Sequence, residues 1–253
     1  MIANTVGPQG TFEIRHHMGS SDVDFKSRAS LSTLFELYQD IAATHAGILG
    51  ASVRGLRESR HAAWILMRMR VEIDKYPTLA EDILLKTWPQ KPRAVYARDY
   101  LIRDELTGEV LVRAAADWII MDLEAREIIR KPFTDYEGVV LDESRALSER
   151  MRKMKPVGEF HVVYEKEIKF SDIDYNEHVN NANYVDYIMD CIPIERHRQS
   201  APKAIELHYI SETGPGETLE FSMTDENDEG KIFVMGVSKT DGRQIFTSVL
   251  EYE

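Results

Sequence analysis

The chain has 253 residues, of which 43% are hydrophobic and 29% are charged, and these proportions are ordinary for a soluble globular protein. Its formal net charge of -12 disfavours a general affinity for nucleic acid or an anionic membrane, because both require a positive surface field. The single cysteine, Cys191, excludes an internal disulfide and a thiolate metal cluster. The sequence shows neither a secretory signal nor an apolar run of about 18 residues, so we expect a cytoplasmic protein without a membrane span.

Polar and apolar patterns in the first half predict one helix and a series of strands. The helix covers Leu31–Ala42, and apolar residues surround most of its circumference, which indicates that other elements enclose it. The dipeptide Thr107-Gly108 predicts a hairpin turn between the last two strands. The strands are expected at Thr11–His17, Ala63–Ile73, Asp82–Trp88, Ala97–Asp104 and Glu109–Met121.

The same order of elements recurs in the second half. A helix is expected over Asn181–Ile192, and Asp241-Gly242 takes the place of Thr107-Gly108 as a hairpin turn. The strands are expected at Phe160–Phe170, Ala204–Tyr209, Thr218–Thr224, Lys231–Lys239 and Arg243–Tyr252.

The polar stretch before each helix also matches its counterpart. Residues 21–40 align with residues 171–190 at a constant offset of 150, with identical residues at Ser21/Ser171, Asp22/Asp172, Asp24/Asp174 and Asp40/Asp190. Two copies of a buried helix with antiparallel strands predict an α+β tandem hot-dog fold, in which a curved sheet wraps around a long central helix in each half. We expect an N-terminal hot-dog domain over residues 1–132, a polar linker over 133–158 and a C-terminal hot-dog domain over 159–253.

The two copies differ where polar chemistry is concentrated. Opposite Asn176 and His178, the first copy carries Lys26 and Arg28. We therefore expect chemistry in the second copy and none in the first.

Asp174, Asn176 and His178 alternate along the chain, so in an extended segment their side chains project to the same side. The helix then begins near Asn180 or Asn181, and a helix N-terminus favours an oxygen that becomes negative during a reaction. A histidine beside it can exchange a proton near neutral pH. The combination suits attack on an acyl carbonyl. The alternative is structural, since Asp and Asn clusters before helices often only form turns and caps. We expect no metal, because a single histidine is no metal-ligand set.

Longer segments carry a resemblance to a known family. HVNNANYVDYIMD after DYNE, WILMRMRVEIDKYPTLAEDILLKTW, RDYLIRDELTGEVLVRAAADWIIMD and LHYISETGPGETL together resemble the acyl-(acyl-carrier-protein) thioesterases of plants and bacteria. The resemblance runs from about Thr11 to the C-terminus. It implies a tandem hot-dog fold, and hydrolysis of the thioester between a fatty acid and the phosphopantetheine arm of acyl carrier protein. Free fatty acid is then released and chain elongation ends.

The resemblance also implies a catalytic set. The family's Asp, Asn and His fall on Asp174, Asn176 and His178, and its downstream acidic residue falls on Glu212. Plant members commonly carry cysteine after that glutamate, whereas this chain has Thr213, which disfavours a thiolate nucleophile. We expect direct attack by water that Glu212 and His178 position and deprotonate, with Asn176 and helix amides holding the carbonyl and Asp174 orienting its neighbours. On residue type alone, Glu212 could equally be a solvated residue at a strand end.

The substrate-binding residues are less sharply marked. A hydrocarbon tail requires a dry apolar slot, and we expect the first copy to line it with Trp64, Met67, Met69 and Trp88, although each could equally be ordinary core. The carrier protein is typically acidic in this family, so its docking would require a local basic cluster. The two candidate clusters are Arg54, Arg57 and Arg60, and Arg150, Arg152, Lys153 and Lys155. No cofactor is expected, and a homodimer remains open.

Other functions remain compatible with the same residues. A hot-dog acyl-CoA thioesterase would use a similar site, and a hot-dog dehydratase pairs a histidine with a carboxylate, as His178 and Glu212 could. A catalytically silent acyl-binding protein is the alternative outside enzymes. Product analysis separates these cases, because hydrolysis gives free acid and thiol whereas dehydration gives an enoyl thioester.

Overall fold

The computed structural model describes residues 5–6, 10–131, 136 and 138–252. Several predicted boundaries lie outside the described residues. These are residues 1 and 132, which bound the predicted N-terminal domain, residue 253, which ends the predicted C-terminal domain, and residues 133–135 and 137 at the start of the predicted linker. The chain divides into two compact units, here called unit 1 (Met1–Met69 and Ile73–Arg150) and unit 2 (Arg70–Glu72 and Met151–Glu253). The division between Arg150 and Met151 lies within the predicted linker, 133–158.

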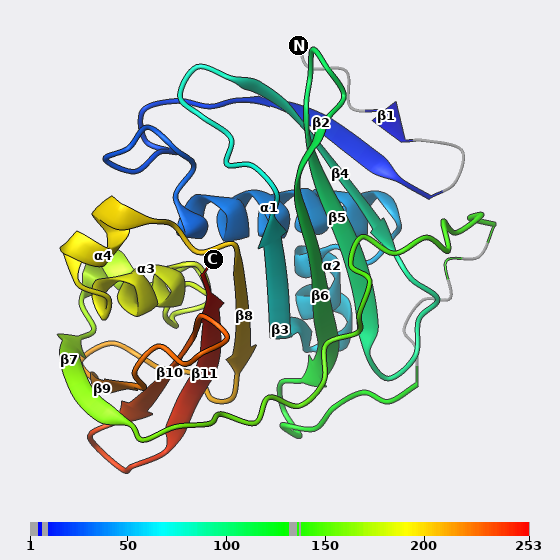
Figure 1. Ribbon diagram of the computed structural model, residues 1–253. Coiled ribbons are helices and arrows are strands. Elements are labelled where there is room, and N and C mark those ends of the chain that lie inside the picture. Colours follow the sequence, from blue (N-terminus) through cyan, green and yellow to red (C-terminus); the bar gives the residue numbers. More distant parts are fainter. Residues whose placement is uncertain (1–4, 7–9, 132–135, 137, 253) are drawn as a thin grey trace. The chain divides into compact units, whose positions relative to one another are not determined.

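Unit 1 packs an antiparallel sheet against one long helix (Figure 1). Its strands lie in the order β1-β2-β4-β5-β6-β3, so β4, β5 and β6 form consecutive hairpins, whereas β3 lies at the far end, beside β6. The elements are β1 (Thr5–Val6), β2 (Phe12–His17), α1 (Leu31–Ile48), α2 (Val53–Arg60), β3 (Ala62–Ile73, of which Arg70–Glu72 count with unit 2), β4 (Asp82–Pro89), β5 (Tyr96–Asp104) and β6 (Val110–Asp122).

Helix α1 is longer than predicted and buries one face along most of its length. It begins after Ser30, whose side chain accepts a hydrogen bond from the Thr33 amide, and the chain leaves it at Gly50 with a positive φ of 80°. Tyr38 is fully buried, and its ring lies 4.9 Å from that of Tyr100 on β5. The first turn is buried on all sides, whereas Glu36 and Asp40 are exposed. The helix therefore forms the core of unit 1 together with the inner face of the sheet.

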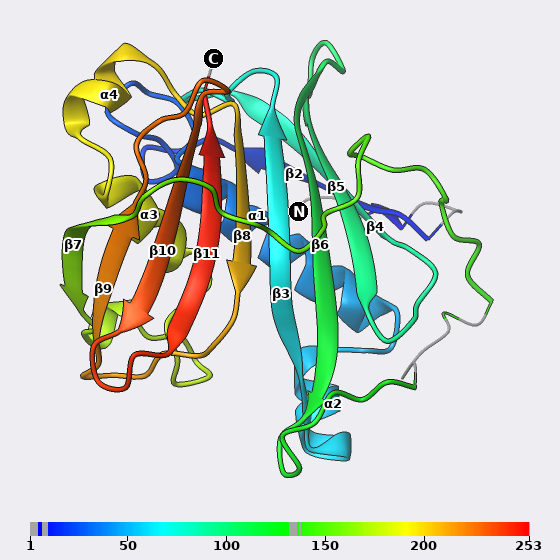
Figure 2. The ribbon, with the colours of Figure 1, turned by 60° about the horizontal axis from the view of Figure 1, so that its bottom comes forward.

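Unit 2 repeats this plan with a shorter helix. Its strands lie in the order β8-β11-β10-β9-β7, and Figure 2 shows them side by side. Its elements are β7 (His161–Glu167), the 3-10 helix η1 (Phe170–Asp172), α3 (Asn183–Asp190), α4 (Ile194–Gln199), β8 (Ala204–Tyr209), β9 (Thr218–Met223), β10 (Lys231–Ser238) and β11 (Gln244–Glu251).

Helix α3 covers less than the predicted Asn181–Ile192. Proline disfavours helical conformation in the residue before it, so Pro193 ends the run and starts the separate helix α4. Aromatic side chains attach α3 to the sheet. The ring of Tyr184 lies 5.6 Å from that of Phe246 on β11, and the ring of Tyr187 lies 5.9 Å from that of Phe221 on β9. Aromatic pairs at such distances stabilise a core beyond the area that they bury.

The predicted hairpin turns are present in both units. Gly108 and Gly242 have φ values of 72° and 74°, in the left-handed region that glycine adopts without a steric cost. In each turn the glycine amide donates to a carbonyl four residues earlier, of Asp104 in unit 1 and Ser238 in unit 2. The two hairpins therefore have the same local structure.

Gly236 on β10 tests the packing of unit 2. A Cβ at this position would lie 2.8 Å from Cδ1 of the fully buried Phe246 ring. We expect Gly236→Ala to lower the free energy of unfolding by about 1–3 kcal/mol, because overpacking forces the ring from its place. Denaturant unfolding measures the change. As a control of opposite sign, Gly47→Ala in the exposed last turn of α1 should raise stability by about 1 kcal/mol. An unchanged midpoint for Gly236→Ala would contradict the packing of Phe246 on β10.

Candidate active site

The segment from Asp174 to His178 forms a tight turn rather than the predicted extended strand. The Asp174 amide donates to the His178 carbonyl at 2.9 Å, and the Glu177 amide donates to the Asp174 carbonyl at 3.0 Å. Glu177 adopts a left-handed φ of 66°. The expectation that alternation places three side chains on one side of a strand is therefore wrong. The residues come together because the chain closes on itself.

The Asp174 carboxylate holds this turn. Its Oδ1 accepts from the Asn176 amide at 2.7 Å, and its Oδ2 accepts from the Asn176 side-chain amide at 3.2 Å. The first bond is a local side-chain to main-chain contact of the kind that aspartate often makes in turns. The second fixes the direction of the Asn176 side chain, so the predicted contact between Asp174 and Asn176 is present.

Two further asparagines connect the turn to α3. Asn180 Oδ1 accepts from the Ala182 amide at 2.9 Å, and Asn183 Nδ2 donates to the Asp172 carbonyl at 3.0 Å. The helix starts at Asn183 rather than at Asn180 or Asn181, because the first of these bonds forms a turn before it. The turn from Asp174 to His178 therefore lies just before the N-terminus of α3.

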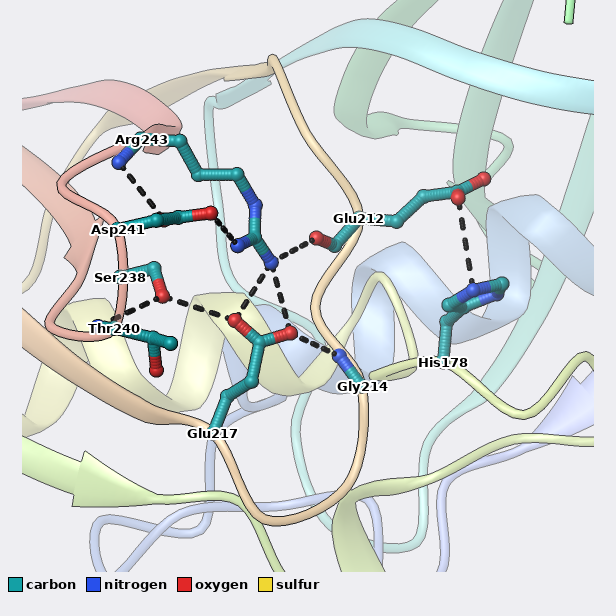
Figure 3. Close-up of polar contacts among 8 residues, drawn as sticks. All are labelled: His178, Glu212, Gly214, Glu217, Ser238, Thr240, Asp241 and Arg243. Atoms are coloured by element: carbon teal, nitrogen blue, oxygen red, sulfur yellow. Dashed lines mark hydrogen bonds and ion pairs between the residues drawn. The ribbon is translucent and has the colours of Figure 1, made fainter.

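Glu212 reaches His178 from the loop that follows β8. His178 Nε2 and Glu212 Oε2 are 3.6 Å apart, and the two side chains are 43% and 36% exposed (Figure 3). A main-chain bond joins the two segments, since the Val179 amide donates to the Thr213 carbonyl at 3.0 Å. All four predicted catalytic residues therefore belong to one turn and the loop bound to it, and their catalytic roles stay predictions.

Two candidate nucleophiles are buried. Thr213 has no exposed surface, although it directly follows Glu212. Cys191 is 6% exposed, and its Sγ donates to the Tyr187 carbonyl. Burial, together with the charge of Asp190, raises the pKa of the Cys191 thiol to about 12. Neither side chain therefore presents a reactive nucleophile at the surface where His178 and Glu212 meet.

Unit 1 contains the same turn with different side chains. The Asp24 amide donates to the Arg28 carbonyl at 2.7 Å, and Asp24 Oδ1 accepts from the Lys26 amide at 2.8 Å, as Asp174 does with His178 and Asn176. Ser27 has a left-handed φ of 58°, matching Glu177. The predicted repeat is thus present as a repeated set of main-chain bonds.

The loop that carries Glu212 also has a counterpart in unit 1. The Ala29 amide donates to the Pro77 carbonyl at 2.8 Å, as the Val179 amide does to the Thr213 carbonyl. This pairing places Tyr76 where unit 2 has Glu212. The Arg28 guanidinium lies 5.1 Å from the centre of the Tyr76 ring, a cation–π contact in place of the histidine and glutamate pair.

A network around the Glu212 loop escaped the sequence analysis. Arg243, in the hairpin between β10 and β11, donates to the Glu212 carbonyl at 3.1 Å and to both oxygens of Glu217 (Figure 3). Glu217 also accepts from the Gly214 amide at 2.9 Å. The hairpin signal Asp241-Gly242 marked this place in the sequence, but the partner of Arg243 lies 26 positions away, beyond the range of a local motif.

The predicted substrate-binding residues all lie in unit 1. Met69 is fully buried and Met67 half-buried on β3, and the Trp64 indole donates to the Ala51 carbonyl at 2.9 Å. Trp88 is 2% exposed, and its indole donates to the Ser144 carbonyl at 3.0 Å, so the segment near Ser144 covers one edge of its ring. The role of these four residues in an acyl pocket stays a prediction.

The interior of unit 1 also holds polar residues that the sequence analysis missed. Arg98 is 6% exposed and contacts Nδ1 of the fully buried His45 at 3.0 Å, as well as the Thr87 hydroxyl. Burial, together with the charge of Arg98, lowers the pKa of His45 to about 3. His45 is therefore neutral at physiological pH, and its Nδ1 accepts the hydrogen bond.

No group of three or more His, Cys, Asp or Glu side chains in the described part of the chain is arranged to hold a metal ion. None of the helices within the described ranges is long and apolar enough to cross a membrane.

Two family models match the chain. The acyl-ACP thioesterase N-terminal domain matches residues 9–133, and the acyl-ACP thioesterase C-terminal domain matches residues 157–252. The palmitoyl-acyl carrier protein thioesterase of Arabidopsis thaliana is 29% identical over 213 residues, covering 79% of this chain and 52% of the relative. Oleoyl-acyl carrier protein thioesterase 1 of the same plant is 26% identical over 241 residues, covering 88% and 66%. The chain thus spans between half and two thirds of the length of these curated relatives.

Solved structures share the fold over nearly the whole chain. An acyl-ACP thioesterase from Bacteroides thetaiotaomicron has a TM-score of 0.86 at 24% identity, covering 96% of this chain and 98% of that one. The 12:0-ACP thioesterase from Umbellularia californica has a TM-score of 0.84 at 19% identity, covering 96% and 97%. Together with the two sheet-and-helix units, these likenesses confirm the predicted tandem hot-dog fold.

Alkylation of Cys191 tests the burial of α3. Its raised pKa reduces the thiolate fraction, so we expect iodoacetamide near pH 8 to label the folded chain at least about 1,000-fold more slowly than the chain in concentrated guanidinium. Mass spectrometry over time reports this residue alone, because the chain has one cysteine. Labelling of the folded protein at the rate of the unfolded control would contradict the packing of Cys191 behind Tyr187.

Proposed function

Because the chain belongs to the acyl-ACP thioesterase family, we propose that it hydrolyses the thioester of fatty acyl-acyl carrier protein. The reaction releases free fatty acid and thereby terminates chain elongation. The observation that carries the proposal is the approach of His178 to Glu212 at 3.6 Å, beside an asparagine held by Asp174. In unit 1 the corresponding turn carries Arg28 and the corresponding loop carries Tyr76, so the proposed chemistry is assigned to unit 2 alone.

In the proposed mechanism, water attacks the thioester carbonyl carbon. Glu212 accepts the proton of this water while the new carbon–oxygen bond forms, and His178 beside it keeps the water in place. Separations of the catalytic groups are often longer before substrate binds, so 3.6 Å is compatible with a water bound by both side chains. Because Thr213 is fully buried, the proposal includes no covalent acyl-enzyme.

Asn176 stabilises the developing oxyanion in this mechanism. The carbonyl electrons move to oxygen as the tetrahedral intermediate forms, and a fixed amide donor lowers the energy of that charge. Asp174 contributes by holding the Asn176 side chain in one direction before substrate arrives. Collapse of the intermediate breaks the carbon–sulfur bond. The thiol has a pKa of roughly 8.5, so it is protonated late: His178 donates a proton to the leaving sulfur, and Glu212 returns the proton it took from the water to His178 across their 3.6 Å contact.

The proposed partner is acyl carrier protein with its phosphopantetheine-linked acyl group. Palmitoyl- and oleoyl-acyl carrier protein thioesterases among the relatives support this substrate class. An acidic carrier requires a local basic surface, because the chain itself has a net charge of -12. Two exposed clusters are candidates, Arg54, Arg57 and Arg60 on α2, and Arg150, Arg152, Lys153 and Lys155 in the linker. The single cysteine supports the cytoplasm as the proposed compartment.

Thiol release from acyl carrier protein substrates of graded chain length tests the function. We expect His178→Ala and Glu212→Gln each to lower kcat by about 100-fold or more, because each removes a group that handles a proton. The matched controls are Arg28→Gln and Tyr76→Phe at the corresponding positions of unit 1, which should leave kcat within about 2-fold.

The products separate the proposal from its alternatives. Hydrolysis of acyl-CoA substrates alone would indicate an acyl-CoA thioesterase, and an enoyl thioester product would indicate a dehydratase. Binding of acyl carrier substrates without turnover would indicate a silent acyl-binding protein. Any of these three results contradicts the proposed reaction.

Asn176 provides a separate test of oxyanion stabilisation. We expect Asn176→Ala to lower kcat by about 100- to 1,000-fold with little change in KM, because the donor acts mainly in the transition state. Asn176→Asp should be at least as damaging, since a carboxylate repels the oxyanion. Steady-state kinetics on one acyl carrier substrate measures both, with Lys26→Ala in unit 1 as the control. A rise in KM with unchanged kcat would instead assign Asn176 to substrate binding.

A further inference from the structure

Arg243 connects the Glu212 loop to the β10–β11 hairpin. Its Nη2 donates to the Glu212 carbonyl at 3.1 Å and to the Glu217 oxygens at 2.8 and 2.6 Å, while its Nη1 donates to Asp241 at 2.6 Å. The guanidinium thus contacts three residues from two segments of chain. Such planar, multiple contacts are specific to arginine, because a lysine ammonium carries one compact charge.

Glu217, which follows Thr213 in the sequence, provides a second connection between the Glu212 loop and the β10–β11 hairpin. Its carboxylate accepts from the Gly214 amide at 2.9 Å and from the Ser238 hydroxyl at 2.9 Å. Partial burial alone would raise the pKa of Glu217, but the hydrogen bonds from Gly214, Ser238 and Arg243 together lower it. Glu217 is therefore ionised at neutral pH, and the charged pair with Arg243 persists through the range in which a thioesterase would be assayed.

The two ends of Glu212 point in opposite directions. Figure 3 shows its carbonyl oxygen turned toward Arg243 and its carboxylate extended toward His178. Any rotation of the main chain at this residue moves the carboxylate relative to the imidazole. The hydrogen bond from Arg243 to the carbonyl opposes that rotation.

Unit 1 lacks this cation. Its hairpin has the same main-chain bonds, with the Asp104 amide donating to the Glu109 carbonyl as the Ser238 amide donates to the Arg243 carbonyl. Glu109 therefore occupies the position of Arg243, and an ionised carboxylate donates no hydrogen bond to a carbonyl. Unit 1 does have a carboxylate that corresponds to Glu217. Glu81 accepts a hydrogen bond from the Thr78 amide at 2.7 Å, as Glu217 does from the Gly214 amide. At this position of the hairpin, unit 2, which has the histidine and glutamate pair, thus carries a cation, and unit 1 carries a carboxylate.

We propose that Arg243 is a positioning residue, which holds the Glu212 carboxylate against His178 by fixing the main chain of the loop from Glu212 to Glu217. The inference rests on the proposed thioester hydrolysis, in which Glu212 accepts the proton of the attacking water. A displacement of about 1 Å at a reacting group can cost about 100-fold in rate. Arg243 itself touches neither the water nor the thioester in this arrangement.

Steady-state kinetics on an acyl carrier protein substrate gives the first test. Arg243→Gln should lower kcat by about 10- to 100-fold and change KM by less than about 3-fold, because the loss concerns a positioned base rather than substrate binding. Arg243→Lys should recover part of the loss, since an ammonium can reach either the carbonyl or Glu217. The control is Glu109→Gln at the corresponding position in unit 1, which should leave both constants unchanged. A rise in KM alone would overturn the proposal.

A double-mutant cycle separates positioning from a general loss of folded protein. If Arg243 acts through Glu212, then Arg243→Gln should cost less than about 3-fold when Glu212 is already changed to Gln. A purely structural role would cost the same factor in both backgrounds. Equal costs in the two backgrounds therefore contradict the inference.

Hydrogen exchange tests the attachment without any assay of activity. We expect Arg243→Gln to speed amide exchange at Gly214, whose partner Glu217 then loses its cation, while exchange in β8 stays as in the wild type. Unchanged exchange at Gly214 would overturn the inference. If the wild type released no thiol from any acyl substrate, the proposed function would fail, and exchange at Gly214 would still decide whether Arg243 holds the loop.

Discussion

Asp174 accepts a hydrogen bond from the amide of Asn176, and the turn that this bond closes determines where every other part of the site lies. The closed turn presents the Val179 amide to the Thr213 carbonyl, which binds the loop after β8. Glu212 is therefore brought to His178 by main-chain bonds, although 34 positions separate the two residues in the sequence. The contact between the two side chains cannot hold the loop in place by itself, since even a charged pair that is partly exposed contributes only about 0–1 kcal/mol.

The equivalent turn in unit 1 shows that the backbone and the chemistry are separable. Asp24 closes it with the same bond, and Arg28 then packs over Tyr76. Arg28 also forms a salt bridge with Asp24 at 2.8 Å, so the charge of that aspartate is balanced within its own turn. In unit 2 the second carboxylate oxygen of Asp174 accepts a hydrogen bond from the side-chain amide of Asn176 instead. The proposed reaction thus depends on side chains placed on a turn that forms without them.

Local patterns predicted the sheet well. β8 has the predicted bounds, because apolar and polar residues alternate from Ile205 to His208, which is a signal within one short segment. The two hairpins followed from glycines that must adopt a positive φ. The repeat and the family motifs also indicated Asp174, Asn176, His178 and Glu212 together, and the structure brings these residues into one turn and its neighbouring loop. The prediction that Asp174 to His178 form an extended segment was wrong, because a hydrogen bond from the Asn176 main-chain amide to the Asp174 side chain closes a turn instead. Arg243 and the buried contact between Arg98 and His45 were missed for another reason, since each depends on partners distant in sequence.

The shared turn means that side chains can differ between the two halves of the chain without a change in the main chain. The side-chain differences between the two copies of the turn, loop and hairpin include the pairs Lys26/Asn176, Arg28/His178, Tyr76/Glu212 and Glu109/Arg243. None requires a new path of the main chain, because the hydrogen bonds that define the turn, the loop and the hairpin are common to both units. The same main-chain frame thus accommodates a cation–π contact in unit 1 and the proposed catalytic groups in unit 2. Unit 1 is accordingly an internal reference for the geometry of unit 2, within the same molecule and under the same solution conditions.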